Sequence, residues 1–218
     1  VPFFMYFWDK LKIHMSTIHQ EIESIIRGDL PGKIYFVEDF IEYSNAENIK
    51  KILLRLTNQK KIERIAHGIY LKPKIHPEFG IIQPSIETIA QEIAKRDKTR
   101  IAPTGVYALY LLGLTTQVPL KTVFLTDGSK RIINISGQTI TFKNTVPKTF
   151  AIENKLLHLI VQAFKEIGKE NISEDFLSKI KKSILKLQSE VLKKELKFAP
   201  VWIQEHVSKI YKTKKNVD

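Results

Sequence analysis

The sequence predicts an α+β protein in which helices and short strands alternate and a helical segment closes the chain. Two observations predict this class. Apolar residues recur at three- and four-residue spacing over residues 17–58 and again after Phe150, whereas short β-branched runs separated by glycine-containing turns lie between. With 218 residues, of which 43% are hydrophobic, the chain is long enough to bury one large core or two smaller ones.

Three helices are expected in the first 58 residues. The first covers residues 17–27, with Ser16 as its candidate N-cap. After a strand-like segment at residues 34–36, acidic residues in the first turns indicate a second, short helix over residues 37–43. The third helix covers residues 47–58. Its apolar stripe, which must face the other two helices, consists of Ile49, Ile52, Leu53 and Leu56.

A β-hairpin is expected directly after the third helix. Residues 60–65 and 69–72 are predicted to form its two strands, joined by the tight turn Ala66-His67-Gly68. Three helices and a two-stranded wing in this order predict an N-terminal winged helix-turn-helix, which we place at residues 15–76. Residues 1–14, an aromatic-rich stretch ahead of Met15, are interpreted as an extension of separate origin.

Residues 77–218 are predicted to form a second, mixed domain. Pro73 and Pro77 mark a linker ahead of it. Helices are expected at residues 85–95 and 107–114, and helical spacing returns from Phe150 to Ile210. Between them a small antiparallel sheet is expected, as a meander of three strands at residues 123–126, 131–135 and 139–143.

Composition excludes several classes of protein. The chain has no cysteine, so disulfide scaffolds and thiolate zinc sites are excluded, and we expect a cytoplasmic protein. Its six histidines show no spacing that would place two metal ligands on one helical face, and no glycine-rich phosphate loop precedes a helix. We therefore expect no metal, no cofactor, no catalytic residue and no membrane-spanning segment.

Positive charge is concentrated in the third predicted helix and the hairpin. The chain has a formal net charge of +12, which favours a polyanionic partner. Residues 45–76 carry eight Lys and Arg against two Asp and Glu, whereas residues 1–44 carry four against seven. A winged helix presents these two elements to duplex DNA, the helix in the major groove and the hairpin along the backbone or minor groove.

The candidate DNA-binding residues follow from this placement. Asn45, Asn48, Lys51 and Arg55 are predicted to read base edges, because amide and guanidinium groups match the hydrogen-bonding patterns in the major groove. A basic exposed helix by itself is more often a solvated face, and the adjoining basic hairpin is what favours DNA. Lys60, Lys61, Arg64 and Lys72 are predicted to contact phosphates along the hairpin. The full set of predicted contacts is Asn45, Asn48, Lys50, Lys51, Arg55, Lys60, Lys61, Arg64, His67 and Lys72.

Three segments carry a resemblance to a known family. They are residues 62–73 (Ile-Glu-Arg-Ile-Ala-His-Gly-Ile-Tyr-Leu-Lys-Pro), residues 111–119 (Leu-Leu-Gly-Leu-Thr-Thr-Gln-Val-Pro) and residues 196–203 (Leu-Lys-Phe-Ala-Pro-Val-Trp-Ile). In this order they resemble the AbiEi-type antitoxins of type IV toxin-antitoxin systems, in the branch labelled DUF6088. The resemblance covers nearly everything after Met15, and residues 1–14 depart from it.

The resemblance implies a function and two partners. Such antitoxins bind operator DNA, repress their own operon through the winged helix, and counteract a nucleotidyltransferase-like toxin through the C-terminal part, in phage defence. The implied protein is not an enzyme and binds DNA through Lys51, Arg55, Arg64 and their neighbours. We expect a monomer or weak dimer. The resemblance favours an indirect mode of neutralisation, without sequestration of the toxin.

Two other readings remain open. The first is a winged-helix transcription factor whose C-terminal domain senses a ligand or dimerises. The second is a metal-dependent nuclease, in which Asp127 and Glu153 would hold Mg²⁺ and Lys155 would position water. The nuclease arrangement needs Glu153 and Lys155 on one strand, whereas helical spacing begins there and would turn the two side chains apart by about 200°.

Overall fold

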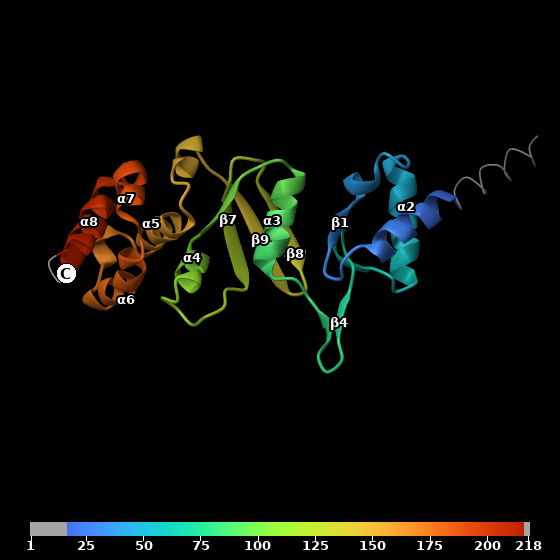
Figure 1. The fold of residues 1–218 in the computed structure, drawn as a ribbon, viewed down its shortest axis with the longest axis horizontal. Coiled ribbons are helices and arrows are strands. Elements are labelled where there is room, and N and C mark those ends of the chain that lie inside the picture. The colour runs from blue at the N-terminus through green and yellow to red at the C-terminus, as the bar shows by residue number, and fades with distance from the viewer. Residues whose placement is uncertain (1–16, 216–218) are drawn as a thin grey trace, which may run out of the picture. The chain divides into compact units, whose positions relative to one another are not determined.

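The structure is a computed structural model that describes residues 17–215 (Figure 1). The predicted α+β class is confirmed, since helices and small sheets alternate and the chain closes in helices. Contacts divide the chain into two compact units, and the division falls after Ile89. The extension predicted at residues 1–14 lies outside the described residues.

The first unit follows the order of elements predicted from the sequence. Its strands form a three-stranded antiparallel sheet in the order β1-β3-β2, with Tyr35 of β1 opposite Tyr70 of β3. Before β4, its elements are a helix over residues 17–28, β1 (Ile34–Phe36), the 3-10 helix η1 (Val37–Phe40), α2 (Ala46–Asn58), β2 (Glu63–Ala66) and β3 (Ile69–Leu71).

The second predicted helix of this unit is wrong in extent. Residues 37–43 form only the 3-10 turn η1 followed by hydrogen-bonded turns. The Asp39 carboxylate accepts the backbone N–H of Phe36 at 2.8 Å, and Phe40 is buried against Tyr35, with ring centroids 5.7 Å apart. Val37 and Phe40 are the buried residues of this 3-10 turn, and two positions so close together do not form the repeating apolar stripe that favours a longer helix.

The core of the first unit lies between its helices and its sheet. The predicted stripe of α2 is confirmed, because all four of its residues are buried. It packs in one cluster with Ile22 of the first helix and Tyr35 of the sheet. Removal of this apolar surface from water is the main force that holds the short elements together, since helices of this length are marginal alone.

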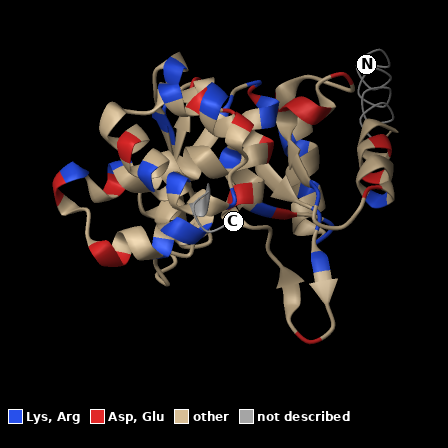
Figure 2. Ribbon diagram, turned by 60° about the vertical axis from the view of Figure 1, so that its left-hand side comes forward, with Lys and Arg blue, Asp and Glu red and all other residues tan. Residues whose placement is uncertain are grey.

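The expected linker after residue 72 forms a second small sheet. Strands β4 (Lys74–His76) and β5 (Gly80–Ile82) pair only with each other. Gly80 has a φ of +70°, which lets the chain turn back after Pro77. Apart from Lys74 and Glu78 this hairpin is uncharged (Figure 2), and Ile75 and Phe79 are both exposed. Pro77 therefore marks the turn of a hairpin, and Pro73 lies just ahead of its first strand.

The second unit contains a four-stranded sheet in the order β6-β7-β9-β8. The predicted antiparallel meander is wrong, because β7 pairs in parallel with β9 and β8 lies at the edge. β6 pairs antiparallel with β7 and was not predicted. The strands are β6 (Ile101–Thr104), β7 (Lys121–Thr126), β8 (Arg131–Ile135) and β9 (Gln138–Asn144). The pairing buries Phe124 and Phe142, whose ring centroids are 6.1 Å apart, on the same face.

Helices complete the second unit. Phe164 of α5 lies at the centre of the C-terminal core. Its ring is in edge-to-face contact with Phe176 of α6 and Trp202 of α8, with ring centroids 5.1 Å and 6.0 Å apart. On the other side of α5, Gln162 accepts a hydrogen bond from Thr104 of β6. The helices are α3 (Ile86–Arg96), α4 (Val106–Leu111), η2 (Pro147–Ala151), α5 (Lys155–Ile167), η3 (Lys169–Asn171), α6 (Glu174–Leu185), α7 (Ser189–Glu195), η4 (Leu196–Phe198) and α8 (Val201–Lys215).

Candidate nucleic-acid interface

Helix α2 has one buried face and one exposed face. Asn45 is its N-cap, and the side chain accepts the backbone N–H of Asn48 at 2.9 Å. Glu47 in the first turn and Arg55 in the last turn both match the helix dipole. Because its buried stripe is complete, the opposite face has no role in the core of this unit and presents its side chains to solvent.

The exposed face of α2 has cations on both sides of a central line that begins with Glu47 and continues with Leu54 and Asn58. At about 100° per residue, Glu47, Leu54 and Asn58 fall within roughly 40° of one another and point most directly away from the buried stripe. Lys50 lies on one side of this line, and Lys51 and Arg55 lie on the other. All six residues are exposed. We call these six residues the α2 outer face.

Two cations of the α2 outer face are in direct contact with no anion in the described part of the chain. Lys50 and Arg55 make neither an ion pair nor a side-chain hydrogen bond there. Lys51 pairs with Glu47 at 3.0 Å, and its hydrogen bond lowers the pKa of the Glu47 carboxyl. Such exposed pairs contribute little to stability, so Lys51 can exchange Glu47 for another anion at small cost.

Asn45 and Asn48, both predicted to read bases, are engaged at the start of α2. The Asn45 side-chain oxygen is occupied by its capping bond. The Asn48 amide donates to Ser44 Oγ at 3.0 Å, and its own oxygen is buried without a partner in the described chain. Both amides therefore stabilise the turn into the helix.

Two lysines predicted as phosphate contacts have partners within the unit. Lys61 Nζ donates to the Glu23 carboxylate, which lowers the pKa of that carboxyl. Lys72 Nζ donates to the backbone oxygens of Arg27, at 2.7 Å, and Asp29. These oxygens lie at the end of the first helix, where carbonyls lack helical partners, so Lys72 acts as a C-terminal cap.

The remaining predicted residues, in the β2–β3 hairpin and just before it, are exposed. Lys60 and His67 are exposed and make no side-chain hydrogen bond among the described residues. Arg64 is also exposed, and its Nε lies 3.4 Å from the carbonyl oxygen of Ala66. Gly68 adopts a φ of +72°, which the tight turn requires. Only residues 59–62 separate this hairpin from α2.

The structure thus divides the ten predicted contacts into two groups. Asn45, Asn48, Lys61 and Lys72 bond to neighbouring groups at helix ends or across the unit, whereas the other six are exposed on or beside α2 and the hairpin, and of these six only Lys51 forms an ion pair among the described residues, with Glu47. Leu54 and Asn58 were absent from the predicted set although both belong to the α2 outer face. Their helical positions relative to the apolar stripe were the signal that could have identified them.

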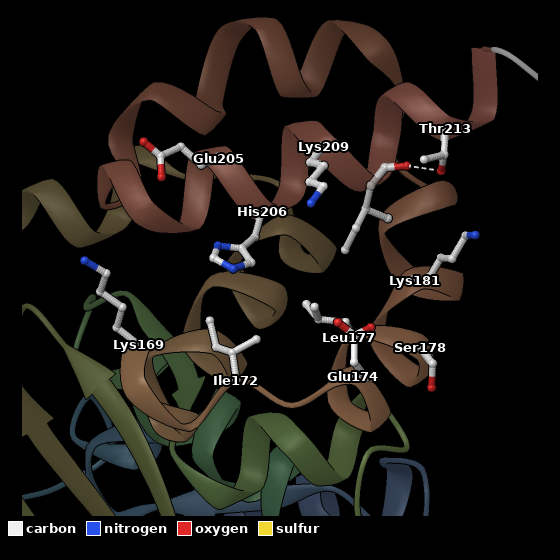
Figure 3. Close-up of a pocket in the computed structure, with 11 residues that line it drawn as sticks. Lys169, Ile172, Glu174, Leu177, Ser178, Lys181, Glu205, His206, Lys209 and Thr213 are labelled. Atoms are coloured by element: carbon white, nitrogen blue, oxygen red, sulfur yellow. Dashed lines mark hydrogen bonds between the residues drawn. The ribbon is translucent and has the colours of Figure 1, made fainter.

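A second surface feature lies between α6 and α8 (Figure 3). It is an open groove of about 800 Å³. His206 lies along it, with Nδ1 2.7 Å from the Trp202 carbonyl oxygen. Its apolar lining is Ile172, Leu177 and Ile210, and its polar lining is Lys169, Glu174, Ser178, Lys181, Glu205, His206, Lys209 and Thr213. The lining has charges of both signs, so the groove is not a simple anion site.

The residues of the nuclease reading do not form its arrangement. Both carboxylate oxygens of Asp127 are bound by Arg100, through its backbone N–H at 2.8 Å and its Nε at 2.7 Å. This ion pair lowers the pKa of Asp127. Lys155 is the first residue of α5, and Asn154 is the N-cap, so Glu153 and Lys155 do not share a strand. No group of three or more metal-ligating side chains occurs among the described residues.

Membrane-spanning helices were also searched for in the described part of the chain. None of its helices combines the length and the apolarity that crossing a bilayer requires.

The fold defines an α+β protein of two units whose first unit exposes a cationic helix. In a comparison with family models, the model of a family of unknown function (DUF6088) matches residues 19–192, so the chain belongs to this family. Among solved structures, the chain is similar to the RV2827C protein from Mycobacterium tuberculosis, with 13% sequence identity and a TM-score of 0.49. That match covers 90% of this chain and 76% of the other. No curated protein matches the chain.

Proposed function

We propose that this protein is a non-enzymatic, cytoplasmic regulator that binds duplex DNA through its first unit. The α2 outer face enters the major groove, and the β2–β3 hairpin follows the phosphate backbone beside it. In this arrangement Lys50, Lys51 and Arg55 neutralise phosphates on the walls of the groove. Lys60 and Arg64 do the same along the hairpin.

One observation carries the proposal. Lys50 and Arg55 are exposed on either side of the central line of α2, and neither makes an ion pair or a side-chain hydrogen bond in the described chain. The cationic charge of the helix face is therefore available to a polyanion. An α-helix fits the width of the major groove of B-form DNA, and its flanking cations then face the two phosphate rows.

The proposal is tested by selection of a binding site from short duplexes with a randomised central segment. We expect a preferred sequence to be enriched, and the same sequence to occur upstream of the gene for this protein. Binding of the selected duplex should weaken steeply as salt rises, because counterions are released. Equal binding to all duplexes, or none, would exclude a sequence-specific regulator.

We further propose that the protein is the antitoxin of a type IV toxin-antitoxin system that represses its own operon. The resemblance of residues 62–73, 111–119 and 196–203 to such antitoxins supports this role. The second unit then counteracts a nucleotidyltransferase-like toxin. Co-expression with the product of the adjacent gene tests it: the protein should restore growth, and so should a variant with Lys50 and Arg55 replaced by Glu, because neutralisation belongs to the other unit.

The groove between α6 and α8 favours a second candidate function. At about 800 Å³ it is within the size range of small-molecule sites. The protein would then be a winged-helix transcription factor whose second unit senses a ligand. Restored growth in the co-expression test selects the antitoxin. No rescue, together with a change in DNA affinity on addition of a cell metabolite extract, selects the sensor.

A further inference from the structure

Leu54 occupies an unusual position on α2. It is 50% exposed, although the helix buries its other leucines and isoleucines completely. It lies on the line of the helix that points most directly away from the core, with Lys50 on one side and Arg55 on the other. Leu54 is therefore the apolar residue of the α2 outer face, and it lies between two cations on a central line that also carries Glu47 and Asn58.

Single exposed leucines are common on protein surfaces, so exposure alone carries no argument. The argument for a role of Leu54 depends on its position instead. Leu54 belongs to no core cluster of its unit, because the buried stripe is complete without it. When a helix enters a groove with its cations against the two phosphate rows, the residue at its centre faces the edges of the bases. An apolar side chain there has one apolar base substituent to meet, the C5 methyl group of thymine.

We propose that Leu54 is a specificity-determining residue that contacts a thymine methyl group in the major groove, so that the DNA site contains thymine opposite this helix. The inference rests on the proposed DNA-binding function. Burial of one methyl group contributes about 0.8 kcal/mol, which corresponds to a roughly fourfold preference for thymine over uracil at that position. Lys50 and Arg55 supply affinity without this preference, since phosphates are the same at every sequence.

Uracil substitution is the test, because deoxyuridine differs from thymidine only by the absent methyl group. The duplex obtained by the selection described above is remade with each thymine replaced singly by deoxyuridine, and dissociation constants are measured by fluorescence anisotropy. The full-length protein should lose affinity roughly fourfold at one or two thymines. Leu54→Ala should bind the thymine and uracil duplexes equally, with an affinity close to that of the original protein for the uracil duplex.

Leu30→Ala is the matched control. Leu30 is 81% exposed in the same unit but lies outside α2, so this variant should keep the thymine preference. Leu54→Met should keep most of it, because an apolar side chain remains. Circular dichroism and thermal unfolding establish that each variant is folded.

The outcomes separate the two proposals. If no duplex is selected, the DNA-binding function fails and the inference falls with it. If a duplex is selected and every uracil substitution is neutral, or if Leu54→Ala retains the thymine preference, DNA binding stands and the role of Leu54 is overturned. A loss of preference that is specific to Leu54→Ala supports it.

Discussion

Lys72 is a residue whose role differs from the one its charge implied. It was predicted to contact a phosphate, yet its ammonium group caps the first helix through the carbonyl oxygens of Arg27 and Asp29. A charged donor at unsatisfied helix-end carbonyls stabilises the folded state directly. Its removal is therefore expected to act on stability and not on DNA affinity.

We predict that Lys72→Met lowers the free energy of unfolding by about 1 kcal/mol, because two helix-end carbonyls lose their donor. Urea denaturation followed by circular dichroism measures the change. The slope of DNA affinity against salt should stay the same, and Lys74→Met, at an exposed site nearby, should leave stability unchanged. A lower salt slope in Lys72→Met would instead assign this lysine to a phosphate.

The unpaired cations of α2 give the opposite expectation. Replacing Lys50 and Arg55 together by Ala should weaken DNA binding at every sequence and reduce the slope of log affinity against log salt by about 2. Stability should be nearly unchanged, since both side chains lie off the buried stripe. Fluorescence anisotropy across a salt series measures the slope. Lys95→Ala, at an exposed lysine of α3, is the control, and an unchanged slope in the double variant would contradict the placement of α2 on DNA.

The sequence predicted well which cations are exposed. It predicted less well which of them form no bond with another group of the protein. The positions of Lys50 and Arg55 relative to the apolar stripe follow from helical periodicity, which is local. The partners of Lys61 and Lys72 do not follow from local periodicity, because Glu23 and Arg27 lie 38 and 45 residues away in the sequence. Long-range pairing of this kind depends on the fold, so a list of basic residues overestimates a binding surface.

At the scale of elements, the β2–β3 hairpin depends on one glycine. Gly68 has a φ of +72°, in the left-handed region that side chains disfavour. We predict that Gly68→Ala destabilises the first unit by about 1 kcal/mol and weakens DNA binding, since the turn must change conformation.

Hydrogen exchange of the hairpin amides, together with the DNA dissociation constant, checks this expectation. Gly28→Ala is the matched control, because Gly28 has no positive φ and an added Cβ would meet no atom within 4 Å. Equal behaviour of the two variants would show that the turn tolerates a side chain.

Helices and strands were predictable from the sequence to different degrees. The stripes of α2, α5 and α6 have clear periodicity: α2 forms close to its expected place, and α5 and α6 lie in the segment after Phe150 where helical spacing was expected. Strand partners were less predictable, because β-branched runs show that a strand exists without showing which strand lies beside it. β7 pairs in parallel with β9, which follows it in the chain only after β8, so this pairing is not a contact between strands that are consecutive in the sequence. The β4–β5 hairpin was not predicted either, because Pro77 indicated a linker.

At the scale of the whole molecule, one buried histidine makes stability depend on pH. His158 of α5 is 5% exposed, and its Nε2 has no partner among the described residues. Burial, with a smaller contribution from the charge of Lys165, lowers its pKa from 6.5 to about 4. The folded state therefore holds the ring neutral in a range where the unfolded chain protonates it.

The sign of the effect follows from this difference. The contribution of neutral His158 is fully present above pH 6.5, and it is lost as the pH falls from 6.5 towards 4. We predict a loss of about 2 kcal/mol near pH 5 relative to pH 7 from this residue. Urea unfolding at several pH values, compared between the original protein and His158→Leu, isolates it.

Between pH 5 and pH 7, the free energy of unfolding of His158→Leu should change by about 2 kcal/mol less than that of the original protein. His206→Gln serves as the control, because His206 is only half-buried and its Nδ1 faces the Trp202 carbonyl. Profiles of the same slope in the original protein and His158→Leu would contradict the assignment.

The strand order of the four-stranded sheet also determines when this sheet can form during synthesis. β9 lies between β7 and β8, although the ribosome makes both neighbours first. Until residue 144 has left the exit tunnel, β7 has only β6 beside it and the edge that will receive β9 is open. Open edges of apolar strands invite pairing with other chains. A nascent chain stalled between β8 and β9 should thus be the form of this protein most dependent on chaperones.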